Sequence, residues 1–234
     1  MDVYLTFDID WAHDTVIAET LEIINSYGVR ATWFATHPTP MNAEIAASGQ
    51  HEMAVHPNFN PLLEGNGGDM RSILGKAREI IPDSKAIRSH SLVKSSKLSY
   101  EIRNFGFTHE SNYFIPPATG INIQAWKDWL GIVQVPIRWI DDVYLYDRTI
   151  RSPYEFLDKF EVLVVDFHPI HIFMNTMTLD DYENTRSIHR DPHALLQRRR
   201  PAGSGGSRDH LIALLEGMTQ ASSNQKVVSE CEPR

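Results

Sequence analysis

The sequence predicts an α/β protein in which helices cover a parallel β-sheet. Short apolar segments that suit buried strands alternate along the chain with segments whose apolar residues recur at helical spacing. The strand-like segments are apolar almost without interruption, as expected of parallel strands that are buried on both faces. Repeated strand–helix units of this kind indicate a layered α/β architecture.

The first strand is expected over 3–7 and the first helix over 15–27, where the apolar pattern ends at Gly28, a natural helix stop. Further strands are expected over 31–35, 52–55, 86–88, 108–111, 132–139 and 162–167, the fifth of these being interrupted by a proline. Further helices are expected over 42–47, 70–81, 96–105 and 210–218, with a helical turn over 153–159.

A single domain is predicted over residues 1–220. Within it, residues 180–207 are polar and rich in Arg, His, Gly and Ser, so a long loop or lid over the site is expected there. Residues 221–234 are expected to form a flexible tail.

Composition excludes several classes of protein. The formal net charge is −8, which argues against a nucleic-acid partner. A single cysteine allows no internal disulfide. No apolar run reaches membrane-spanning length, and no secretion signal precedes the first strand, so a cytoplasmic protein is expected. The sequence does not specify an oligomeric state.

The first chemical signal lies at the end of the first strand. Asp8 and Asp10 follow this strand and are two residues apart, so both carboxylates should point the same way while Ile9 faces the core. Two such carboxylates repel each other, and a divalent metal between them is the economical counter-charge. The alternative is that one aspartate caps the next helix and the other is solvated.

Polar side chains also follow the other predicted strands. They are His56, Arg88, His90, Asp141, Asp142 and His168. The carboxyl ends of parallel barrel strands form the active-site face, so these groups are expected around one mouth.

These residues lie in motifs that resemble the polysaccharide deacetylase, or NodB-homology, family of carbohydrate esterases, which includes carbohydrate esterase family 4. The resemblance covers residues 3–175 in order. It rests on TFDID at 6–10, GQHEMAVHPNFNP at 49–61, IRSHS at 87–91, WIDD at 139–142 and VVDFHP at 164–169. It implies a distorted (β/α)7 barrel and a divalent metal ion, with zinc as the default.

The resemblance also implies a role for each motif residue. Asp8 would be the catalytic base, Asp10 and His56 metal ligands, Arg88 the partner of the base, and His168 the general acid, oriented by Asp141 or Asp142. Trp139 would offer an apolar wall to a sugar ring, and Trp11, Phe59 and His90 are further candidates for substrate contact.

The chain departs from the family at one ligand position. The second motif of the family has two metal-binding histidines four residues apart, whereas here His56 is followed by Asn60. An amide oxygen is a weak zinc ligand beside imidazole. Either Asn60 binds weakly, another group replaces it, or the metal is lost. His90, His171 and His51 are candidate replacements, and His51 is interpreted as structural because its strand parity points away from His56.

The leading hypothesis is a metal-dependent hydrolase that removes an N-acetyl group from a saccharide in O-antigen or capsule biosynthesis. One alternative is an impaired deacetylase-like barrel that binds a saccharide without turnover. Another is an amidohydrolase on a non-sugar C–N bond, which fold resemblance alone does not distinguish.

Overall fold

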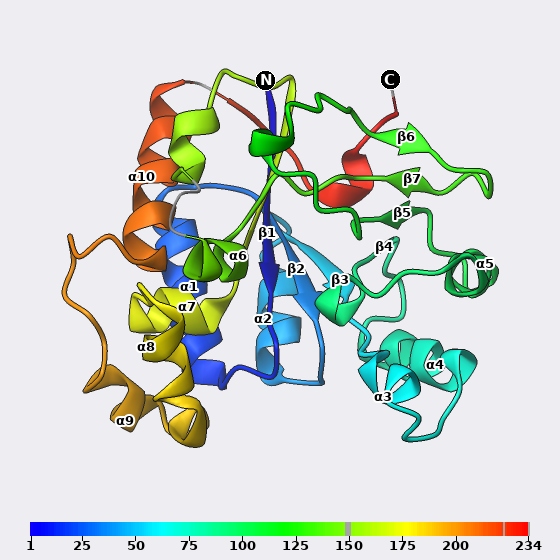
Figure 1. Cartoon of the computed structure of the whole chain (residues 1–234), viewed down its shortest axis with the longest axis horizontal. Helices are drawn as coiled ribbons and strands as arrows, with labels where there is room; N and C mark the ends of the chain where they lie inside the picture. The colour runs from blue at the N-terminus through cyan, green and yellow to red at the C-terminus, as the bar shows by residue number, and fades with distance from the viewer. Residues whose placement is uncertain (148–150, 222, 234) are drawn as a thin grey trace.

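The computed structural model describes residues 1–147, 151–221 and 223–233 of the chain (Figure 1). A central sheet is built from β1 (Asp2–Asp8), β2 (Ala31–Ala35), β3 (Glu52–Val55), β4 (Ala86–Ile87), β5 (His109–Glu110), β6 (Trp126–Lys127), β7 (Val133–Gln134), β8 (Trp139–Ile140), β9 (Val162–Phe167) and β10 (Asn224–Gln225). Its order is β6-β7-β5-β4-β3-β2-β1-β9-β8, with β10 added beside β1.

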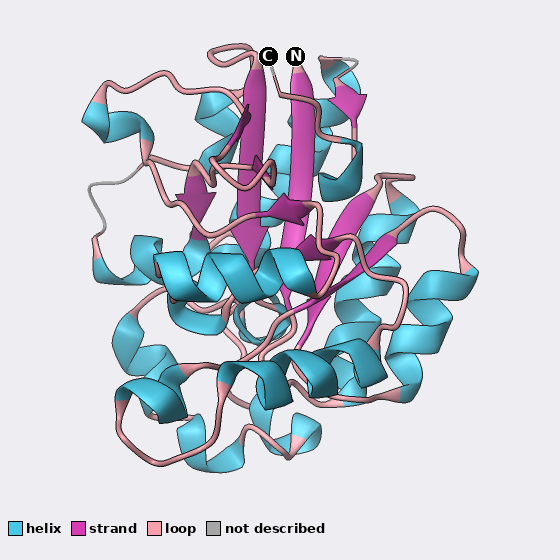
Figure 2. Ribbon diagram, turned by 90° about the vertical axis from the view of Figure 1, so that its right-hand side faces the viewer, coloured by secondary structure: helices cyan, strands magenta, loops and turns pink. Residues whose placement is uncertain are grey.

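The neighbouring strands of this sheet are parallel except for the β6–β7 pair. The sheet curls into a half-barrel (Figure 2). An isolated parallel bridge between Phe114 and Ile137 links the chain after β5 to the segment before β8. The predicted α/β class and the curled barrel are therefore confirmed.

The α-helices are α1 (Asp14–Ser26), α2 (Pro40–Ala47), α3 (Asn60–Leu63), α4 (Met70–Ile80), α5 (Ser96–Asn104), α6 (Asp141–Tyr146), α7 (Pro169–Met174), α8 (Leu179–Glu183), α9 (Pro192–Leu196) and α10 (Ser207–Gln220). Short 3-10 turns are η1 (His90–Leu92), η2 (Pro117–Thr119), η3 (Pro153–Phe156), η4 (Arg186–Ile188) and η5 (Val228–Glu230). Helices α4 and α5 begin at the side-chain caps Asp69 and Ser95, each of which accepts a backbone N–H of the first turn.

The core lies between β1 and the helices α1, α7 and α10, which Figure 1 shows together on one side of the sheet. β1 is buried along its whole length. Phe7 at its end stacks on Trp33 of β2 with ring centroids 4.3 Å apart, and it also packs against Phe167 of β9. This packing fixes the ends of three parallel strands, and the functional side chains begin at those ends.

Residues 180–207 are not the long loop that the sequence predicted. They include most of α8, all of η4 and α9, and the start of α10, and Leu195 of α9 is completely buried in the main core. The backbone N–H of Arg200 donates to the carbonyl of Met174, which ties the segment to α7. Helices of three to five residues are too short to show a clear hydrophobic period, so the pattern missed them.

The predicted flexible tail is also corrected for the residues that the structure describes. β10 pairs in parallel with the start of β1, and Val228 in η5 is fully buried. Arg30 forms a bidentate ion pair with Glu230 at 2.9 and 2.7 Å. Residues 222 and 234 of that predicted tail lie outside the described part.

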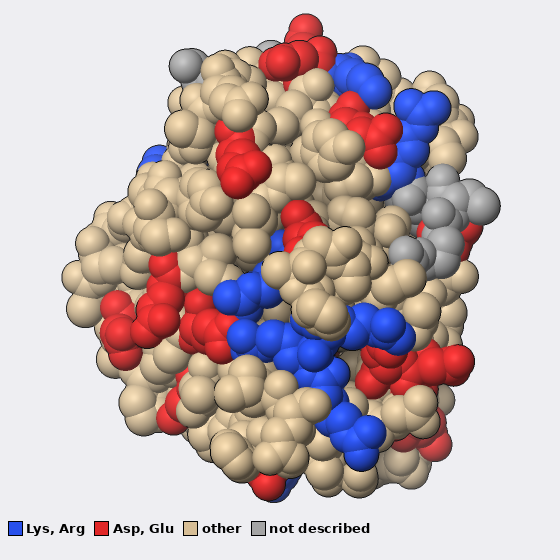
Figure 3. Space-filling model, turned by 90° about the vertical axis from the view of Figure 1, so that its left-hand side faces the viewer, with Lys and Arg blue, Asp and Glu red and all other residues tan. Residues whose placement is uncertain are grey.

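Basic side chains gather in a band on the side of α8, α9 and α10, with acidic side chains beside them (Figure 3). Arg199 and Arg208 both pair with Glu19 of α1, and Arg200 pairs with Asp181 at 2.6 Å. Arg199 therefore joins this segment to α1, while Arg200 ties two parts of the segment together.

Within the described residues, the helices are too short or too polar to cross a membrane.

Candidate active site

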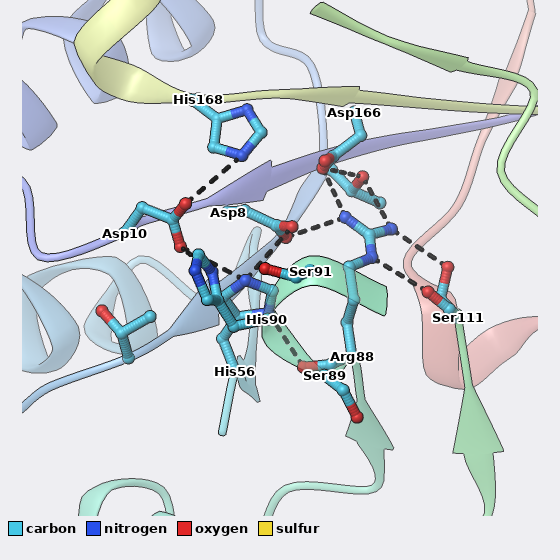
Figure 4. Close-up of polar contacts among 12 residues, drawn as sticks. Asp8, Asp10, His56, Arg88, Ser89, His90, Ser91, Ser111, Asp166 and His168 are labelled. Atoms are coloured by element: carbon cyan, nitrogen blue, oxygen red, sulfur yellow. Dashed lines mark hydrogen bonds and ion pairs between the residues drawn. The ribbon is translucent and has the colours of Figure 1, made fainter. Parts of the chain in front are cut away.

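Arg88 is the buried centre of the site. It follows β4, is inaccessible to solvent, and donates from Nη1 to Oδ1 of Asp8 at 2.8 Å (Figure 4). The same nitrogen donates to Asp166 of β9, while Nη2 donates to the hydroxyls of Thr6 and Ser111. The predicted Asp8–Arg88 pair is thus formed, and its arginine is shared by a second carboxylate.

Asp166 is a site residue to which the sequence reasoning gave no role, although it lies in the quoted VVDFHP motif. It is buried, and burial raises the pKa of its carboxyl to about 8, with Arg88 opposing the rise and Asp8 adding to it. Strand parity was the available signal, because Asp166 shares a strand face with His168.

Asp10, His56 and His90 form the cluster best suited to a cation. Oδ1 of Asp10 lies 3.3 Å from Nε2 of His56 and 3.1 Å from Nδ1 of His90. These three ligand atoms lie within 4.8 Å of one another. Burial acts to raise the pKa of Asp10, but hydrogen bonds with His56 and His90 outweigh it and hold that pKa well below the ordinary value.

The surroundings of His56 fit a metal ligand. Its Nδ1 lies 2.8 Å from the backbone carbonyl oxygen of Arg88, which places the proton on Nδ1 and leaves Nε2 free to face Asp8 and Asp10. Ligating histidines commonly donate their other ring nitrogen to a carbonyl or carboxylate in this way. One carboxylate and two imidazoles are also a suitable donor set for a divalent ion such as zinc.

Asn60 has a different neighbour. It begins α3, and its side-chain nitrogen donates to the hydroxyl of Ser91 at 3.1 Å. Ser91 directly follows His90 in η1 and has a left-handed backbone, with φ at 57°. The amide therefore contacts the turn that presents His90.

Asp141 and Asp142, whose roles the sequence could not distinguish, have different partners. Oδ1 of Asp141 lies 2.7 Å from Nδ1 of His168, and its Oδ2 accepts the backbone N–H of His168 at 2.8 Å. Asp142 instead lies 2.7 Å from Nε2 of His171. Its other oxygen is 3.8 Å from Nε2 of His168.

His168 is surrounded by carboxylates. Besides Asp141 and Asp142, Oδ2 of Asp10 lies 3.5 Å from its Nε2. Burial acts to lower the pKa of His168, but Asp142 and Asp141 outweigh burial and raise that pKa well above the ordinary value. The side chain therefore favours its charged, proton-donating form.

Of the three predicted aromatic contacts, the structure brings one to the site. Trp11 is partly exposed beside the cluster, with its ring edge-on to His90 at a centroid distance of 5.1 Å. Phe59 and Trp139 are each 1% exposed and lie in the hydrophobic core. Their predicted contact with substrate is corrected, because their rings pack between helices and strands and not against the cavity. Trp139 instead packs on Phe167.

His51 has the structural position that its parity predicted. Its Nε2 lies 2.9 Å from the side-chain oxygen of Asn25 in α1, and its ring lies edge-on to Trp33.

A model of the family described as WbmS-like polysaccharide deacetylase matches residues 5–186. The chain belongs to this family. The match spans every motif named above, from Asp8 to His168. A comparison with curated proteins found no match.

The fold is also found in several solved structures. A protein from Bordetella bronchiseptica, described as a proposed polysaccharide deacetylase involved in O-antigen biosynthesis, is 38% identical with a TM-score of 0.83, over 92% of this chain and 89% of that one. A proposed polysaccharide deacetylase from Mycobacterium smegmatis is 18% identical with a TM-score of 0.57, over 100% and 92%. A family 4 carbohydrate esterase from Streptomyces lividans, solved with acetate, is 14% identical with a TM-score of 0.50, over 96% and 90%.

Beside the cluster of Asp10, His56 and His90 lies a cavity of about 320 Å³. Its lining includes Asp10, His90 and His168, together with Tyr182 and His189. The last two come from the segment predicted as a lid, which therefore does contribute to the site. Sequence reasoning missed them because nothing in that polar segment distinguished one side chain from another.

Proposed function

We propose that the chain is a divalent-metal-dependent deacetylase that removes an N-acetyl group from a sugar used in surface polysaccharide biosynthesis, such as O-antigen. The observation that carries the proposal is that two side chains, each held by a partner of opposite charge, lie beside the cluster of Asp10, His56 and His90. Asp8 is paired with Arg88, and His168 is paired with Asp141. A base and an acid held in this way beside a cation site suit hydrolysis of an amide.

Asp10, His56 and His90 are the residues that we propose to hold the ion, with zinc as the default. His90 takes the place of the second histidine of the family motif, and Asn60 supports it through Ser91. When bound, such an ion lowers the pKa of a water and polarises a carbonyl oxygen.

The remaining chemistry falls to the protein side chains. Asp8, oriented by Arg88, takes a proton from the water that attacks the acetamide carbonyl. The C–N bond then breaks as His168 gives the proton on Nε2 to the leaving nitrogen, so that acetate and a free amino sugar are released. Asp141 keeps Nε2 directed at the site by holding Nδ1.

The B. bronchiseptica neighbour supports the O-antigen setting, because its description names that process. The cytoplasmic location remains a prediction from the sequence.

The test combines metal content with acetate release. Elemental analysis of the purified protein should give about one equivalent of metal, lost in His56→Ala and His90→Ala and retained in the matched variant Asn60→Ala. Wild type should release acetate from N-acetylated sugars, and Asp8→Asn should not.

Other outcomes would favour the alternatives. Loss of metal in Asn60→Ala with retention in His90→Ala would contradict the ligand assignment. Saccharide binding without metal or acetate release would favour the non-catalytic module. Release of acetate from non-sugar amides alone would favour the amidohydrolase.

A further inference from the structure

Two adjoining cavities meet at the proposed reaction centre. The first, of about 320 Å³, extends from Asp10 and His168 towards α8 and η4. The second, of about 310 Å³, borders Asp8 and His56 and extends past Leu92 of η1. Asp10 and His168 border both cavities, so a substrate that reacts there has two directions in which to extend.

In the first direction the cavity is lined by Tyr182, Arg186 and His189, which are called the wall below. The aromatic rings of the wall pack against one another in a row. Tyr182 lies edge-on to the buried His171 with centroids 4.9 Å apart, and His189 lies 4.8 Å from Tyr182 on its other side.

The wall is anchored on several sides. Beside Tyr182, Asp181 receives two hydrogen bonds from Arg200 at 2.7 and 2.6 Å. Asp181 also accepts the backbone N–H of Thr178, and Thr178 caps α8 in return. Leu195 in the next helix is fully buried. The segment is thus tied to its surroundings by a core side chain, a capping box and a bidentate ion pair, contacts of the kind that a fixed wall requires.

An enzyme that deacetylates internal units of a polysaccharide needs a groove that is open at both ends, because the chain enters and leaves past the reacting sugar. Here Tyr182, Arg186 and His189 line one end of the site. We propose that these side chains close that end, so that this deacetylase acts on an N-acetyl sugar at the end of its substrate, as a single activated sugar or a terminal residue, with the remainder extending past η1 and α6.

The side chains along the site agree with that orientation. Trp11 and Tyr146 are 46% and 73% exposed at the first cavity, and Tyr146 also borders the second. Their flat apolar faces with polar edges suit a sugar ring. This inference rests on the proposed function, since it specifies which unit of a saccharide that activity reaches.

The test compares end units with internal units. A panel of N-acetylglucosamine and N-acetylgalactosamine, their uridine diphosphate esters and tetra-N-acetylchitotetraose is incubated with the protein. Acetate is measured, and tandem mass spectrometry locates the free amine in the tetramer. We expect internal units to react at least about 100-fold more slowly than an end unit or a single sugar.

Variants of the wall provide a second readout. The double variant Arg186→Ala/His189→Ala, and separately Tyr182→Ala, should raise the share of internal deacetylation in the tetramer. Arg190→Ala, on the same segment and exposed away from the cavity, should leave the positional pattern unchanged. Equal reaction at internal and end units by wild type would overturn the inference while leaving the proposed function intact. Acetate from no member of the panel would contradict the proposed function, and the inference with it.

Discussion

Asp141 holds His168 through both of its carboxylate oxygens. Oδ1 lies 2.7 Å from the ring Nδ1 and Oδ2 lies 2.8 Å from the backbone nitrogen, so side chain and main chain of His168 are fixed by one group. Asp141 is fully buried at the start of α6, directly after β8, and His168 directly follows β9. The pairing of β8 with β9 therefore sets the direction of the imidazole.

Replacing Asp141 with asparagine tests that relationship. The amide side chain offers one acceptor oxygen where the carboxylate offers two, so it would satisfy only one donor of His168 and would no longer favour the charged ring. We expect kcat/KM for acetate release to fall by about 10²–10⁴-fold, the range of general acid catalysis. Asp83→Asn, at an exposed site in another loop, is the control. An unchanged rate in Asp141→Asn, with thermal unfolding also unchanged, would contradict the role of the pair.

Arg88 is predicted to be essential for stability as well as for chemistry. It is the shared partner of Asp8 and Asp166, and all three side chains are buried. Arg88→Leu leaves the buried Asp8 without its cation and removes a hydrogen-bond donor from the buried carboxyl of Asp166, so we expect a loss of about 3–5 kcal/mol in the free energy of unfolding near neutral pH. Urea denaturation followed by circular dichroism measures it.

Two comparisons make the Arg88 result specific. Arg103→Leu, an exposed site on α5, should change stability by less than about 0.5 kcal/mol. The double variant Arg88→Leu/Asp166→Leu should recover part of the loss, because it removes one of the two buried carboxyl groups that lose Arg88 as their partner. A double variant less stable than Arg88→Leu alone would argue against these partnerless carboxyl groups as the cause.

The positions of several site residues could be predicted because residues that end parallel strands lie together at one edge of the sheet. Asp8, His56 and His168 each directly follow or end an apolar strand, and strands that are parallel and adjacent bring such ends to one edge. At these positions the order of strands in the sequence was therefore enough to predict which side chains lie together. The sequence predicted that either Asp141 or Asp142 orients His168. The structure pairs Asp141 with His168 and Asp142 with His171.

The features that the sequence did not predict depend on contacts between distant segments, and a local sequence pattern does not indicate such contacts. Tyr182 borders the cavity in a segment that is held against α7 by the backbone hydrogen bond from Arg200 to Met174 and by the burial of Leu195. Trp139 faces the core because β8 presents it towards Phe167 and not towards the cavity. β10 is only two residues long, so its pairing with β1 could not be distinguished from an irregular tail.

Stability should depend on pH through His51. Burial lowers the pKa of its imidazole to about 4, with Arg30 adding to the effect, from an ordinary value of 6.5. Between pH 6.5 and 4 the unfolded chain binds a proton that the folded chain refuses, so the contribution of His51 is fully present above pH 6.5 and declines as the pH falls towards 4. The full decline is at most about 3 kcal/mol, and solvent screening of the ring reduces it.

The variant His51→Gln isolates the contribution of His51 to the pH dependence of stability. A glutamine amide can still donate to the side-chain oxygen of Asn25, and it does not titrate. The free energy of unfolding of this variant, measured by urea denaturation and taken relative to wild type, should therefore rise as the pH is lowered from 7 to 4. His193→Gln, at an exposed position, should follow wild type over the same range. If His51→Gln and wild type gave parallel curves, the buried imidazole would not be the group that resists protonation.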